Sequence, residues 1–137
     1  MSRPYEILEH TADLKIRVQG KTLPELFANA LKGMFQAAHY QAEKNSPLNK
    51  RKIILSSFNL PSLLVDFLSE ALYLSETHKE VYPEIEIKSL TEKKLTGNLI
   101  GQKLAKMGVH LKAVTYHDLS VVQDKNGLWQ ATLLFDI

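Results

Sequence analysis

The sequence predicts an α+β protein, a two-layer sandwich in which two amphipathic helices cover one face of a mixed or antiparallel β-sheet. Two segments have apolar residues at every third or fourth position, each preceded by a residue that caps helices, and these predict the helices. Most of the remaining chain alternates polar and apolar residues, the period of half-buried strands, and this predicts a sheet of about six to seven strands. The expected order is β-β-α-β-α-β-β-β-β.

The composition fits one globular domain that covers residues 1–137, with 45% hydrophobic and 23% charged residues. The chain has no cysteine, which excludes disulfides, thiolate nucleophiles and zinc–thiolate sites. No run of about 18 apolar residues and no signal-peptide pattern is present, so we expect a cytoplasmic protein without a membrane segment. The net charge of +2 is too small for nucleic-acid binding through overall charge.

The first helix is expected to begin after Thr22, which has capping-box spacing with Glu25, while Pro24 occupies the first turn. The second is expected after Asn59, again with a proline, Pro61, in the first turn. Both segments carry one apolar stripe. The stripe of the first contains Leu23, Leu26, Phe27, Ala30, Leu31, Met34, Phe35 and Ala38, and that of the second contains Leu60, Leu63, Leu64, Phe67, Leu68, Ala71 and Leu72.

Seven segments have strand character: 5–9, 14–18, 52–55, 84–88, 95–100, 113–122 and 128–137. Residues 91–94 form an expected turn, and Asn126-Gly127 is the strongest hairpin signal in the chain because both residues tolerate positive φ. Residues 41–49 are expected to form a surface loop.

The candidate site consists of carboxylates from the two ends of the sequence. Residues 10–13 form a polar turn between the first two strands, in which Asp13 is a candidate metal ligand and His10 a supporting residue or second ligand. Asp136 and the terminal carboxylate of Ile137 supply two more oxygen donors. Three such groups repel one another unless a cation joins them, and oxygen donors favour Ca²⁺, Mg²⁺ or Mn²⁺ over zinc. The alternatives are an ordinary Asx turn and a frayed terminus.

A second candidate surface is the mixed polar and apolar strand that begins at Lys112. Here Lys112, Thr115 and His117 could contact phosphate or the carboxylates of a partner; the alternative is a half-exposed strand. The sequence has no phosphate-binding glycine loop, no nucleophile elbow and no zinc-protease motif, and no serine, threonine or lysine stands in an activating context. We therefore expect a protein that is not itself an enzyme.

Several segments, in order along nearly the whole chain, resemble the archease family. They are residues 5–13, 20–27 with 33–35, 63–64 with 73–74, 112–117 and 135–137. The resemblance implies an accessory protein that activates a GTP-dependent RNA ligase of the RtcB type, promoting ligase guanylylation and multiple turnover in tRNA splicing and RNA repair. RNA would be contacted through the ligase. The family's metal-binding positions fall on Asp13, Asp136 and Ile137, with Ca²⁺ preferred.

Two departures from the family pattern are Lys15, where a small residue is common, and Phe67, where tryptophan is expected. Two other functions stay open. A metal-dependent phosphohydrolase or nuclease would use the acids at positions 13, 66 and 136 with His10. A general RNA-binding or chaperone-like module would use the residues at 112 and 117 with the Lys93–Lys94 turn.

Overall fold

The computed structural model describes residues 4–8 and 13–137 of the chain. Within them the elements are β1 (Tyr5–Leu8), β2 (Asp13–Gly20), α1 (Leu23–Ala37), β3 (Gln41–Ala42), β4 (Asn49–Ser56), α2 (Leu60–His78), β5 (Glu80–Leu90), β6 (Lys94–Lys106), β7 (Ala113–Gln123) and β8 (Trp129–Asp136). The α+β class and both predicted helices are confirmed. Neither helix in this part of the chain is long and apolar enough to cross a membrane.

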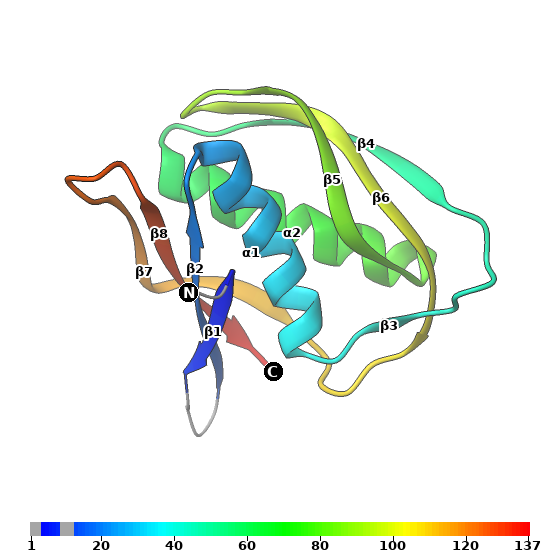
Figure 1. Ribbon diagram of the computed structural model, residues 1–137. Helices are drawn as coiled ribbons and strands as arrows, with labels where there is room; N and C mark the ends of the chain where they lie inside the picture. The colour runs from blue at the N-terminus through cyan, green and yellow to red at the C-terminus, as the bar shows by residue number, and fades with distance from the viewer. Residues whose placement is uncertain (1–3, 9–12) are drawn as a thin grey trace.

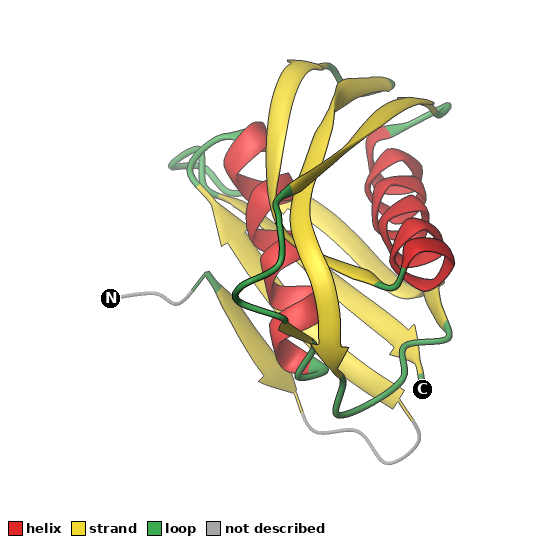
Figure 2. Cartoon of the chain, turned by 90° about the vertical axis from the view of Figure 1, so that its right-hand side faces the viewer, coloured by secondary structure: helices red, strands yellow, loops and turns green. Residues whose placement is uncertain are grey.

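The strands form two antiparallel sheets with the helices between them (Figure 1). The first sheet has the order β1-β2-β8-β7, and in the second β6 pairs with β3, β4 and β5. Helix α1 packs on β2 of the first sheet and β5 of the second, and α2 packs on β7 and on the second sheet. Figure 2 shows the same layering after a turn of the molecule.

This arrangement differs from the single sheet and two layers that the sequence predicts. The physical reason is visible in α2, where Ser62, Val65 and Ser75 are buried in addition to the predicted stripe. A helix that contacts a sheet on two sides needs an apolar surface wider than one stripe. The structure also adds β3, a strand of two residues inside the segment expected to be a loop.

The predicted helix caps and the hairpin are confirmed. The side chain of Thr22 accepts a hydrogen bond from the Glu25 amide at 3.2 Å, and that of Asn59 accepts one from the Ser62 amide at 2.9 Å. Between β7 and β8, Gly127 has a φ of +88°. This tight turn returns the chain next to β7, so that β8 occupies the middle of the first sheet, between β7 and β2.

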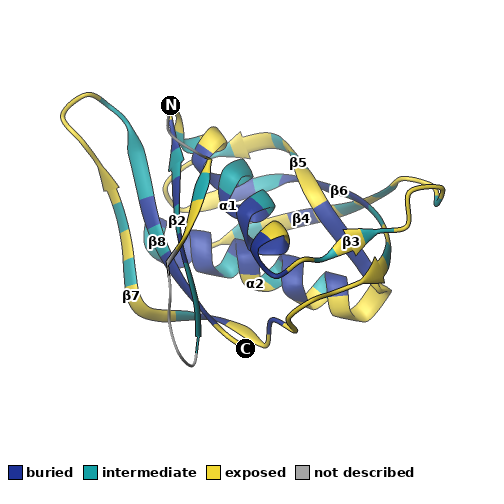
Figure 3. Cartoon of the chain, turned by 60° about the horizontal axis from the view of Figure 1, so that its bottom comes forward, coloured by how far each residue is buried: buried dark blue, intermediate teal, exposed yellow. Residues whose placement is uncertain are grey.

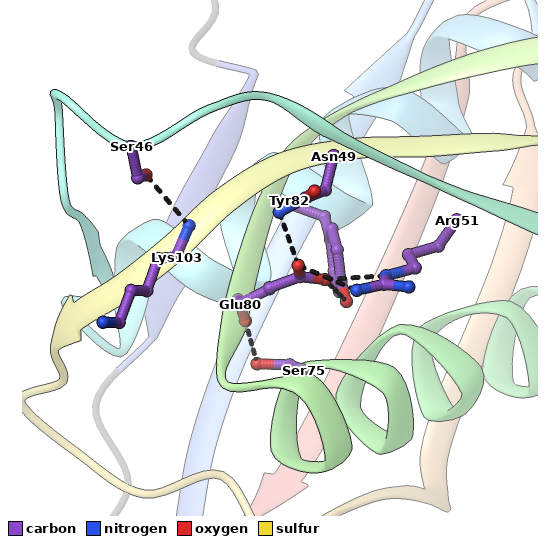
Figure 4. Close-up of polar contacts among 7 residues, drawn as sticks. All are labelled: Ser46, Asn49, Arg51, Ser75, Glu80, Tyr82 and Lys103. Carbon is purple, nitrogen blue, oxygen red and sulfur yellow. Dashed lines mark hydrogen bonds and ion pairs between the residues drawn. The ribbon is translucent and has the colours of Figure 1, made fainter.

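A buried carboxylate, Glu80, connects the beginning of β5 to β4 (Figure 4). Its Oε1 accepts hydrogen bonds from Arg51 Nε at 2.9 Å and from the Tyr82 hydroxyl at 2.7 Å. Its Oε2 accepts from Arg51 Nη2 at 3.0 Å and from Asn49 Nδ2 at 2.6 Å. Each carboxylate oxygen thus has two donors, as a charge buried in a protein interior requires.

We predict that Glu80→Gln lowers the free energy of unfolding by about 3 kcal/mol. This is the lower end of the range for breaking a buried ion pair, because the Arg51 side chain is still 32% exposed. Urea unfolding measures the change. Glu86→Gln, which removes an exposed carboxylate from the same strand, is the matched control and should leave the unfolding midpoint nearly unchanged. Equal midpoints for the two variants would contradict the assigned role of Glu80.

The same group predicts a loss of stability in acid. The hydrogen bonds from Arg51 hold the pKa of the Glu80 carboxyl below its ordinary value of 4.5. A carboxyl whose pKa is lowered by folding contributes stability above its unfolded pKa and loses it as the pH falls through the folded value. The difference in unfolding free energy between wild type and Glu80→Gln should therefore shrink below pH 4.5. A difference that stays constant down to roughly pH 3 would exclude this linkage.

Candidate functional site

The pairing of β2 with β8 places the two candidate aspartates opposite each other. Asp13 opens β2, Asp136 closes β8, and the two are register partners in the antiparallel ladder. Side chains at such positions are on the same face of the sheet, with Cβ atoms roughly 4.5–5.5 Å apart. Two carboxylates that the sequence separates by nearly the whole chain are therefore neighbours.

This register is set by the opposite, buried face of the same strands. Phe135 is fully buried and is the partner of Leu14, and the next inward pair is Ile16 with Leu133, both fully buried. A shift of one residue would turn Phe135 toward solvent, because successive side chains point to opposite faces. Burial of the apolar face thus forces Asp13 and Asp136 onto the outer face together.

The end of β8 is also held from its other side, by β7. Asp136 is the register partner of Ala113, and its carbonyl accepts a hydrogen bond from the Lys112 amide at 2.8 Å. Figure 3 shows the chain end and the segment that leads into β7 exposed at one end of the molecule. Asp136 therefore belongs to the sheet between two strands, and Ile137 follows it directly at the surface.

The donor set fits a hard divalent cation. In the part of the chain that the structure describes, no three histidine, aspartate or glutamate side chains come together as a metal site. A third donor beside Asp13 and Asp136 would be the terminal carboxylate of Ile137. Like charges directly opposite each other destabilise a sheet, and a cation coordinated by both would offset this. Oxygen donors of this kind suit Ca²⁺, Mg²⁺ or Mn²⁺. Metal binding itself stays a prediction.

The other predicted site residues follow one another along the chain, from Lys112 just before β7 to His117 within it, and lie progressively further from Asp136. Exposed Lys112 is next to Asp136 through the amide contact described above. Thr115 is half-buried, is the partner of Leu134, and accepts a hydrogen bond from the His117 amide at 3.2 Å. His117 is beyond these, in a bulge between Thr115 and Ser120. The structure thus brings the Lys112 backbone to that of Asp136 and places His117 further along β7. His10 is outside the described residues.

The bulge in β7 also supplies an ion-pair partner for Lys15. Asp118 has a φ of +55° there, and its carboxylate lies 3.7 Å from the Lys15 ammonium and 3.6 Å from His117 Nε2. The charge that departs from the family pattern therefore has a partner on β7. Phe67, the second departure, is fully buried and packs against Phe27 with a ring-centroid distance of 5.6 Å.

The residues of the two alternative functions are not assembled in the described part of the chain. Asp66 accepts hydrogen bonds from the hydroxyls of Ser57 and Tyr116 on the side of α2, and it belongs to no group of three potential metal ligands. The Lys93–Lys94 turn is in the β5–β6 hairpin, at the opposite end of the molecule from the segment that leads into β7 (Figure 1). It therefore forms no continuous patch with Lys112.

Sequence reasoning missed a pocket at the C-terminal end of α2. Its lining includes Tyr40, Leu72, Leu104 and Leu111, which come from four separate segments. No periodicity or motif in the sequence relates these positions. Their apolar character could be read from the sequence, but their meeting at one place could not.

Comparison with known proteins identifies the class to which this fold and its paired aspartates belong. The sequence profile of the archease protein family matches residues 5–137. The chain is 37% identical to protein archease of Methanosarcina barkeri over 143 aligned positions, which cover 98% of this chain and 97% of that protein. It is 34% identical to protein archease of Saccharolobus islandicus over 140 positions, with 98% and 99% covered.

Two solved structures have the same fold. The solution structure of Methanobacterium thermoautotrophicum protein 1598 has a TM-score of 0.68 at 23% identity, covering 98% of this chain and 99% of that one. The crystal structure of an archease from Thermotoga maritima, described as a possible chaperone, has a TM-score of 0.68 at 19% identity, covering 100% and 98%. The chain belongs to the archease family.

We predict that Ca²⁺ binds the wild-type protein and that Asp136→Asn weakens its affinity by more than about tenfold, since even residues that only support metal ligands contribute about 10- to 100-fold. Isothermal calorimetry measures the affinity, and thermal unfolding with and without CaCl₂ measures the stabilisation. Glu92→Gln, in the turn between β5 and β6, is the control for the loss of one exposed carboxylate. A peptide extension after Ile137 should weaken binding as well. Unchanged calcium affinity in Asp136→Asn would exclude Asp136 as a donor. Unchanged affinity in the extended chain would exclude the carboxylate of Ile137.

Proposed function

We propose that this protein is an accessory factor that activates an RtcB-type GTP-dependent RNA ligase. In this role it promotes guanylylation of the ligase and multiple turnover in tRNA splicing and RNA repair, while the ligation chemistry belongs to the ligase. Membership of the archease family supports the proposal. The expected compartment is the cytoplasm.

The observation that carries the proposal is the Asp13–Asp136 register pair. These two carboxylates, with that of Ile137, would hold the cation, Ca²⁺ in the first place and Mg²⁺ or Mn²⁺ as alternatives. A bound divalent cation offsets negative charge on phosphate groups. This stabilises the transition state for transfer of a nucleotidyl group. The ladder with β2 and β7 fixes the backbone of Asp136, so the place from which its side chain extends is set before a partner arrives.

Two further observations favour activation of a partner over catalysis by this chain alone. The sequence has no cysteine and no serine in a nucleophile elbow. Among the three candidate donors, Asp136 and Ile137 are exposed and Asp13 is half-buried, so a partner can reach them. Such a surface can be completed by another protein, which supplies the walls that exclude water. RNA would then be contacted through the ligase.

We predict that Asp13→Ala abolishes most of the stimulation of ligase guanylylation, because one of the donors is lost. The measurement is the rate at which labelled GTP is incorporated into the ligase, with wild type, Asp13→Ala or no accessory protein. Glu92→Ala is the matched control and should stimulate like wild type. Equal stimulation by wild type and Asp13→Ala would show that the site is assigned wrongly.

The same preparations distinguish the nuclease alternative. The purified wild-type protein, incubated alone with RNA and Mg²⁺ or Mn²⁺, should leave the RNA intact. Cleavage that disappears in Asp13→Ala would favour the metal-dependent nuclease over the accessory role.

A further inference from the structure

The pocket at the end of α2 has a floor of apolar side chains, and Ser75, Glu76, Lys79 and His110 also line it. Leu72 and Leu111 are buried there, and Leu104 packs against the core beside them. The hydroxyl oxygen of Tyr40 accepts a hydrogen bond from the Leu111 amide at 3.2 Å. Burial raises the pKa of the Tyr40 hydroxyl, which therefore stays neutral. Such a floor favours an apolar ligand group.

The mouth of this pocket has exposed apolar residues around it. Met107 lines the pocket and is 40% exposed, and Val109 follows in the same segment at 36%. Glu76 on α2 approaches His110 with 3.8 Å between Oε1 and Nε2, so the two sides of the mouth are in contact. Apolar residues of this size around a pocket are typical of protein–protein interfaces.

The volume of the pocket limits what can enter. It is about 70 Å³, whereas an engineered cavity of about 150 Å³ binds benzene and a water molecule takes about 30 Å³. The branched end of valine, leucine or isoleucine is of suitable size for this volume. The flexible Met107 side chain can adapt its position to such a group.

The pocket is next to the proposed metal site. Leu111 forms part of its wall, and the following residue, Lys112, donates its amide hydrogen bond to the Asp136 carbonyl. A standard protein interface covers about 800 Å² of each partner, roughly 20–30 residues. A protein that places its active site against Asp13 and Asp136 therefore covers the pocket too. A second copy of this chain seated there would instead cover the aspartates and block the proposed activity.

We propose that this pocket receives one aliphatic side chain of the ligase and is the docking anchor of the complex. The inference rests on the proposed function and adds where the partner binds. The pocket then supplies binding affinity for the ligase, and the carboxylates supply the stimulation of ligase guanylylation. The two contributions are therefore separable by mutation.

The test measures the dissociation constant of the complex and the guanylylation rate at saturating accessory protein. Met107→Asp places a charge at the mouth and should raise the dissociation constant at least tenfold, while the rate at saturation and the calcium affinity stay those of wild type. Met107→Ala, a milder change at the same exposed position, should raise it about fourfold, by loss of roughly one buried methylene equivalent at the rim. Ile54→Asp, on the outer face of the second sheet, is the matched control and should bind like wild type.

Each contrary result has a distinct meaning. Wild-type affinity in both Met107 variants overturns the docking inference and leaves the proposed function standing. A wild-type protein that neither binds nor stimulates the ligase overturns the proposed function and the inference with it. A dimer of the isolated chain that Met107→Asp dissociates in sedimentation would assign the pocket to a second copy and overturn the inference.

Discussion

The pairing of β8 with β2 is the interaction on which the candidate site depends. The tight turn at Gly127 directs the last strand back into the middle of the first sheet, where Leu133 and Phe135 enter the core. The free energy gained by burying these side chains fixes the register, since a slip of one residue would expose them. On the outer face of these two strands Leu134 is the one apolar side chain, and it is buried as well. The closeness of Asp13 and Asp136 follows from the packing on the other side of the same strands.

The layered arrangement extends this constraint to the rest of the molecule. Because both helices pack between the sheets, the surfaces left for binding are the outer sheet faces, the helix ends, the connecting segments and one exposed side of α2. The carboxylates are on an outer face and the pocket is at a helix end, and the segment from β6 to β7 connects them. The Glu80 ion pair stabilises the start of β5, directly after α2, and so supports the helix end that forms the pocket. Stability and binding thus depend on neighbouring parts of the chain.

Local patterns predict the elements of this fold well, and contacts between distant segments poorly. The caps at Thr22 and Asn59 and the turn at Gly127 each depend on a few consecutive residues, whose chemistry determines the conformation. The division into two sheets depends on which strands pair. The alternation of polar and apolar residues within a strand is the same whichever strand it pairs with, so the sequence does not reveal the pairing. The carboxylates could be proposed as a group from their charge, but their register depends on the core. The Glu80 ion pair and the β7 bulge, with Asp118 at positive φ, have no local signal.

We propose that Asp13 and Asp136 hold a divalent cation, close to the backbone amide of Lys112. Titration of the isotopically labelled protein with Mn²⁺, followed by nuclear magnetic resonance, tests it directly, because this paramagnetic ion broadens the signals of nearby amides. Selective broadening around residues 13, 112 and 136, lost in Asp136→Asn, is the predicted result. Broadening centred elsewhere, for example on Glu84 and Glu86 of β5, or no selective broadening at all, would contradict it.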